Sequence, residues 1–139
     1  MSAVAMPPKV QIINLIQQSA MTKEALAGFE VVLAAKIKEP TLAPRKPELK
    51  EQLDRIYGLY KTAIQSFRQN LQTTYDLGQK VIESIKATDD LQEISVIFTK
   101  FQAEITAVLE TQARLSRDIE RYETQIIPLL PEGTKFIQG

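Results

Sequence analysis

The second half of the chain carries a repeating apolar pattern that constrains the fold more than any other feature. From Leu91 to Ile126, apolar residues recur at alternating intervals of three and four positions. This is the a/d spacing of a helix that packs lengthwise on another helix, and it continues for about five heptads. We therefore predict one uninterrupted long helix with a packing seam. The predicted seam comprises Leu91, Ile94, Phe98, Phe101, Ile105, Val108, Gln112, Leu115, Ile119, Tyr122 and Ile126.

Gln112 interrupts this seam with a polar residue at an a position. One interpretation is an amide that is tolerated near a solvated part of the seam. The other is an amide that pairs with a polar group on the facing helix and so fixes the register, as buried amides do in coiled coils. Both interpretations stay open at the level of the sequence.

A second helical pattern precedes the first and predicts its partner helix. It begins at Pro47, a residue suited to the first turn of a helix, and runs to Ile85 with one slip near Leu71. The connection at residues 86–90 is short and polar, so the two helices must fold back on each other. We predict an antiparallel hairpin over residues 47–127, with Thr88 as the N-cap of its second helix.

Gly58 and Gly78 lie inside the first helix of this hairpin. Each glycine costs roughly 1 kcal/mol in a helix interior relative to alanine. They are either tolerated defects or points where another backbone approaches closely.

The N-terminal part of the chain is also expected to be helical. A leader at residues 1–8 precedes a segment at 9–38 whose apolar residues have helical spacing. Thr22 could cap a second helix within this segment, and whether it contains one helix or two stays open. Prolines in and beside residues 39–46 predict a stiff linker, and residues 128–139 are expected to form an extended tail.

The apolar stripe on the last helix is wider than a pair of helices needs, because Ile97 and Leu109 flank the seam. We infer a contact of at least three helices, with the third supplied by the N-terminal segment or by another subunit. The predicted fold class is all-α: a long, coiled-coil-like antiparallel hairpin that forms a three- to four-helix bundle with an N-terminal helix or helix pair. Candidate partner contacts are Ile97, Leu109, Leu129, Leu130, Phe136 and Ile137.

Absent residue types argue against catalysis. The chain has no cysteine and no histidine, so the thiolate nucleophile, the usual general base and the commonest zinc ligands are all missing. Neither a glycine-rich phosphate loop nor a nucleophile-elbow motif occurs. We predict a non-enzymatic protein with no catalytic, cofactor or metal site, and the sequence makes no prediction about small molecules.

The charge balance argues against a dedicated nucleic-acid binder, because 17 basic residues match 17 acidic ones. A basic group formed by Lys36, Lys38, Arg45, Lys46 and Lys50 could contact phosphate or an acidic partner, or simply aid solubility. The N-terminus lacks signal-peptide features and the apolar runs are too short to cross a bilayer. We expect a soluble chain, either cytoplasmic or part of an assembled particle.

These features favour a structural or adaptor subunit of a larger assembly. It would act through coiled-coil helix packing and tail contacts, as a homo-oligomer or within a hetero-assembly. A virion, a phage tail or a secretion-type machine would suit such a subunit. The alternatives are a membrane-active helical protein, such as a toxin component, and a nucleic-acid-binding helical protein.

Overall fold

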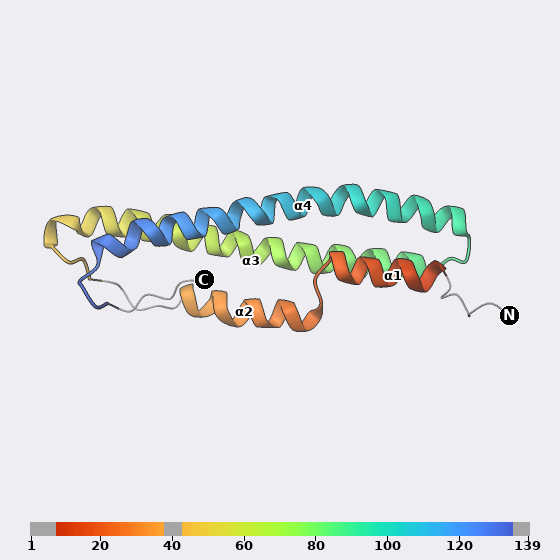
Figure 1. The fold of residues 1–139 in the computed structure, drawn as a ribbon, viewed down its shortest axis with the longest axis horizontal. Helices are drawn as coiled ribbons and strands as arrows, with labels where there is room; N and C mark the ends of the chain where they lie inside the picture. Colours follow the sequence, from red (N-terminus) through yellow and green to blue (C-terminus); the bar gives the residue numbers. More distant parts are fainter. Residues whose placement is uncertain (1–7, 38–42, 135–139) are drawn as a thin grey trace. The chain divides into compact units, whose positions relative to one another are not determined.

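The computed structural model describes residues 8–37 and 43–134 of the 139-residue chain. These residues form helices and no strand, and α3 and α4 are joined by a short turn as an antiparallel hairpin (Figure 1). The predicted all-α hairpin fold is confirmed. The helices are α1 (Pro8–Ser19), α2 (Lys23–Ile37), α3 (Lys50–Lys86) and α4 (Leu91–Ile126), with 3-10 helices η1 (Pro47–Leu49) and η2 (Ile127–Leu129).

The chain divides into two compact units. The first contains residues 1–26 and 71–110, and the second contains residues 27–70 and 111–139. Each unit therefore contains one part of α3, one part of α4 and most of one short helix, which is α1 in the first unit and α2 in the second.

The N-terminal segment forms two helices, which answers the question that the sequence leaves open. α1 ends at Ser19, and Thr22 stands immediately before α2. The hydroxyl of Thr22 accepts a hydrogen bond from the backbone N–H of Ala25 at 3.1 Å, so it satisfies one of the unpaired donors at the start of α2.

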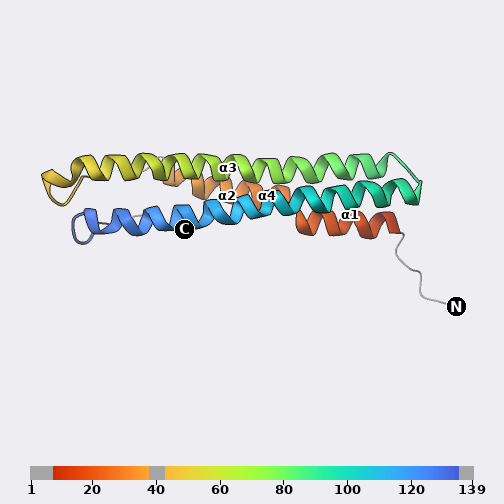
Figure 2. The same cartoon turned by 90° about the horizontal axis from the view of Figure 1, so that it is seen from above.

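Apolar side chains from three helices form the core of the first unit. In two perpendicular views, α1 lies beside the stretches of α3 and α4 that belong to the same unit (Figures 1 and 2). Ile12 and Ile13 of α1, together with Ile97 and Phe98 of α4, pack against this core and are partly buried. The buried residues of this core are Ile16, Ala20, Val81, Ile82, Ile85, Ile94, Phe101 and Ile105.

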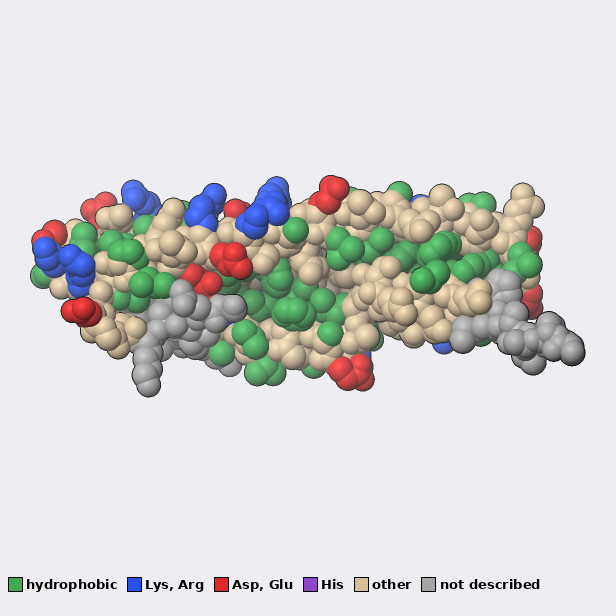
Figure 3. Space-filling model, viewed as in Figure 1, with side chains coloured by type: hydrophobic (Ala, Val, Ile, Leu, Met, Phe, Trp, Pro, Cys, Tyr) green, Lys and Arg blue, Asp and Glu red, His purple; other side chains and the backbone are tan. Residues whose placement is uncertain are grey.

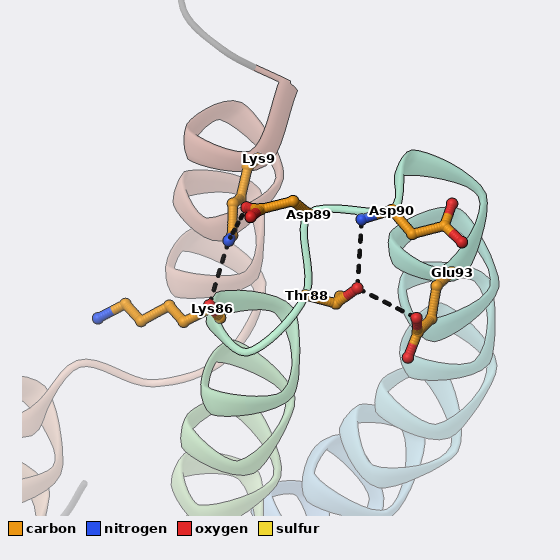
Figure 4. Close-up of polar contacts among 6 residues, drawn as sticks. All are labelled: Lys9, Lys86, Thr88, Asp89, Asp90 and Glu93. Atoms are coloured by element: carbon orange, nitrogen blue, oxygen red, sulfur yellow. Dashed lines mark hydrogen bonds and ion pairs between the residues drawn. The ribbon is translucent and has the colours of Figure 1, made fainter.

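The turn of the hairpin is closed by polar contacts (Figure 4). The structure corrects the predicted cap: Asp90 directly precedes α4 and accepts the backbone N–H of Gln92 at 3.0 Å. The Thr88 hydroxyl instead accepts a hydrogen bond from the backbone N–H of Asp90 and donates one to the carboxylate of Glu93, which stabilises the turn. Lys9 of α1 donates to the Lys86 carbonyl and to Asp89, both at 3.1 Å, and ties α1 to the turn.

Most residues of the predicted seam on α4 are wholly or partly buried. Ile94, Phe101, Ile105, Ile119 and Ile126 are buried. The seam residues of intermediate burial are Phe98, Val108, Gln112, Leu115 and Tyr122.

Leu91 differs from the predicted seam, because 59% of its surface is exposed. Helical side chains lean toward the N-terminal end of their helix and cover the preceding turn. Leu91 is the first residue of α4, so that turn does not exist.

The residues directly after α4, up to position 130, pack against their own chain. Leu129 and Leu130 are buried, and the Leu129 carbonyl accepts the N–H of Arg45 at 2.8 Å. The start of the predicted extended tail is therefore a folded corner formed by η2 and the following turn. The physical reason is that Pro128 ends the helix while the leucines beside it still have apolar surface to bury.

Gly78 is a point of close approach between α3 and α1, whereas Gly58 is not. A Cβ atom added at Gly78 would lie 2.5 Å from the Cβ of Ala20 and 3.8 Å from Ile16. The same atom at Gly58 would meet nothing within 4 Å. The two interpretations of these glycines therefore apply to one residue each.

We expect Gly78→Ala and Gly58→Ala to change stability in opposite directions. Gly58→Ala removes a flexible residue from an open helix position and should stabilise the protein by about 1 kcal/mol. Gly78→Ala should destabilise it by about 1–3 kcal/mol, because α1 must move away to admit the methyl group. Urea unfolding followed by circular dichroism measures both. Equal stabilisation by the two substitutions would contradict the close contact of α1 with α3.

Candidate interaction site

α2 has an unusual composition for a helix at a protein surface. Its sequence, KEALAGFEVVLAAKI, has charged residues only at positions 23, 24, 30 and 36. The remaining residues are apolar or small and occupy every side of the helix. A helix that is hydrophobic all round is normally buried on all sides.

The inner face of α2 packs on α3 and α4 within the second unit. Leu33 is buried, and Phe29 meets Phe67 of α3 edge-on with 6.4 Å between ring centroids. Glu30 forms an ion pair with Arg68 of α3 at the border of this contact.

The outer face of α2 exposes apolar side chains. Val31 and Val32 are 71% and 48% exposed. Figure 3 shows hydrophobic side chains gathered over the position of α2 in Figure 1. We call Val31 and Val32 the outer face of α2, because Phe29 takes part in the contact with α3. Contiguous apolar surface of this kind marks contact sites more often than scattered exposed residues do.

Beneath α2, three polar side chains from three helices meet inside the second unit. The Lys36 Nζ of α2 lies 2.6 Å from the Oε2 of Glu123 of α4, and the Tyr60 hydroxyl of α3 donates to the same oxygen at 3.1 Å. Lys36, Glu123 and Tyr60 are only 1%, 3% and 0% exposed. We call these three residues the buried polar cluster.

Burial of this ion pair has a large energetic consequence. Removing two charges from water costs several kcal/mol per ion, and the attraction between them offsets this cost only when the contact is close and hydrogen-bonded. The short Lys36–Glu123 contact and the Tyr60 hydroxyl meet both conditions. Either charge left alone would be strongly destabilising.

The buried polar cluster was missed by sequence reasoning. The sequence places Lys36 in the basic group around the linker and indicates no packing role for Glu123. The signal that could have revealed them is spacing: Lys36 follows the buried Leu33 by three positions, and Glu123 lies between the buried Ile119 and Ile126 at helical intervals.

The predicted basic group around the linker is not one continuous surface. Lys36 is buried, and Lys50 pairs with Asp54 within its own helix at 3.1 Å. Arg45 and Lys46 are exposed beside η2, and Lys38 lies outside the described residues. Within the described residues, the exposed members of the group are therefore Arg45, Lys46 and Lys50, and Lys50 already pairs with Asp54.

The six predicted partner contacts have different positions. Leu109 is 38% exposed and Ile97 is half-buried against the first-unit core. Leu129 and Leu130 are buried within the chain, which removes them from the candidate partner surface. Phe136 and Ile137 lie outside the described residues.

Gln112 is partly buried on α4. Its Oε1 atom is inaccessible to solvent and has no hydrogen-bond partner among the described residues. This oxygen therefore supplies no register-fixing contact across the seam.

Within residues 8–37 and 43–134, no group of three or more acidic side chains is placed to hold a metal ion. No helix in the same residues combines the length and apolarity needed to cross a bilayer. The second unit presents a surface suited to helix packing, and a buried ion pair lies beneath that surface.

Comparison of the chain with protein-family models, curated proteins and solved structures finds no match.

We expect Glu123→Leu to destabilise the protein by about 3–5 kcal/mol, because the buried Lys36 would lose the close contact with the Glu123 carboxylate. The matched control is Asp54→Leu, which breaks the exposed Lys50 pair and should cost less than about 1 kcal/mol. Denaturant unfolding of the two variants provides the measurement. A similar small loss in both would contradict the burial of the Lys36–Glu123 pair.

Proposed function

We propose that this chain is a non-enzymatic structural or adaptor subunit of a larger protein assembly, and that it binds a neighbouring helix through the outer face of α2. One observation carries the proposal: apart from four charged residues α2 is apolar or small throughout, yet among the residues that the structure describes only its inner face is covered. A neighbouring helix would bury the other side.

The surroundings of Val31 distinguish it from an ordinary exposed valine. Positions one helical turn away hold Ala27, Gly28, Ala34 and Ala35, none of which carries a charge. Small side chains also allow another helix to approach closely. The outer face of α2 thus has the composition of a helix–helix contact.

Val96 of α4 is a useful contrast. It is 65% exposed, but its neighbours one turn away are Gln92, Glu93, Thr99 and Lys100. A single exposed apolar residue in polar surroundings is common on soluble proteins and needs no partner.

The size of the outer face sets the strength of the expected contact. Full burial of a Val side chain contributes about 1.5–3 kcal/mol, so burying the exposed parts of Val31 and Val32 would contribute roughly 2–3 kcal/mol. Association costs at least about 4 kcal/mol in lost freedom of motion. The outer face alone is too small for a tight isolated pair, which favours a subunit held by several contacts at once.

A membrane-active helical protein is the competing function, because lipid could also cover an apolar face. Helices that lie in a membrane surface combine one apolar side with a strongly charged one. α2 has no such charged side, and its inner face already packs on the hairpin. This pattern supports helix packing over lipid binding.

We expect Val31→Glu to weaken association at least tenfold, because a charge would have to be buried in the contact; tenfold corresponds to about 1.4 kcal/mol. Val96→Glu, the matched control, should leave association unchanged. Light scattering coupled to size-exclusion chromatography measures self-association, and recovery of proteins bound to the tagged chain in its native source measures hetero-assembly.

Two results would count against the proposal. One is a wild-type chain that stays monomeric at every concentration and retains no protein partner from its source. The other is binding to lipid vesicles that Val31→Glu abolishes, which would favour the membrane-active alternative.

A further inference from the structure

The apolar pattern of α2 does not define which side of the helix should face the hairpin. Residues 31–35 are Val, Val, Leu, Ala and Ala, five consecutive apolar positions. Successive positions are about 100° apart on a helix, so these five surround it. Rotation by one position would replace Leu33 with Val32 or Ala34 at the contact, with little change in apolar character.

The charged residues of α2 do distinguish its sides. Lys23 and Glu24 are exposed in its first turn, and Glu30 and Lys36 pair with the hairpin. The side chains of Glu30 and Arg68 are 45% and 34% exposed, so water can replace either partner if α2 turns. Lys36 and Glu123 have no such substitute, because both are buried.

We propose that the Lys36–Glu123 pair, with Tyr60, sets the rotational orientation of α2 on the hairpin. In the observed orientation the Lys36 Nζ meets Glu123 at 2.6 Å and the Tyr60 hydroxyl completes the contact. Any other orientation separates the pair and leaves Glu123 buried without a counter-charge. The pair thereby selects which apolar side of α2 points outward.

This inference is independent of the proposed assembly role, because it concerns contacts within the second unit only. It also has a distinctive consequence. Replacing both partners of a buried ion pair by apolar residues is often neutral or stabilising, whereas removing one partner is not. The double replacement should therefore preserve folding and lose the preference for one orientation.

The absence of cysteine from the chain allows a direct test. Val31→Cys places a thiol on the outer face of α2, and Leu33→Cys places one on the inner face. In the otherwise unchanged protein, a maleimide should modify position 31 faster than position 33, by a factor on the order of ten or more, because a buried thiol reacts only after local opening.

The same two reporters are then measured in Lys36→Met/Glu123→Leu. We expect reaction at position 33 to become faster and reaction at position 31 to become slower, since α2 would occupy several orientations. Circular dichroism should show unchanged helix content. Lys50→Met/Asp54→Leu is the control, because it removes an exposed ion pair from the same unit and should leave both rates unchanged.

Three outcomes would overturn the inference. The first is a folded double variant with the original ratio of rates, since α2 would then keep its orientation without the pair. The second is faster modification at position 33 with no slower modification at position 31. This result would mean that α2 detaches, and that the pair holds α2 on the hairpin without setting its orientation. The third is loss of helix content in both Lys36→Met/Glu123→Leu and Lys36→Leu/Glu123→Leu, which would make the pair a requirement for folding.

Discussion

The hairpin carries more apolar surface than its two helices can bury on each other, and this excess is the constraint on which the rest of the structure depends. Each unit covers this excess apolar surface with a different short helix. In the first unit α1 packs closely, with Ala20 set against Gly78 and Ile16 in the core. In the second unit α2 uses Leu33, an aromatic contact and a buried ion pair. One helix is positioned by shape and the other largely by charge.

The difference between α1 and α2 has a physical origin in their sequences. α1 has polar residues such as Gln11 and Gln18 on its exposed side, so apolar burial alone tells it which side to turn inward. α2 lacks such residues over most of its length, and a charged contact can supply the missing distinction. The same lack of polar residues leaves apolar surface on the outside of α2, where we propose that a neighbouring subunit binds.

The sequence predicts the hairpin well, because a pattern held over about five heptads depends only on residues close together in the chain. It predicts much less about contacts between distant residues. Glu123 lies 87 positions from Lys36, and nothing local indicates that the two meet. The burial of Leu129 and Leu130 was missed for a similar reason, since it depends on contacts beyond the end of the helix. The choice of Asp90 over Thr88 as cap reflects the uncertainty of one or two residues in any helix boundary.

Hydrogen exchange of the intact protein, read by mass spectrometry on peptides from α1 and α2, tests most directly whether these short helices cover the hairpin. Helices of 12 and 15 residues are marginal in water on their own, so protection of their amides reports docking. We expect both helices to exchange orders of magnitude more slowly than an unstructured chain. Exchange of α1 and α2 at the unstructured rate, with α3 and α4 still protected, would contradict this account.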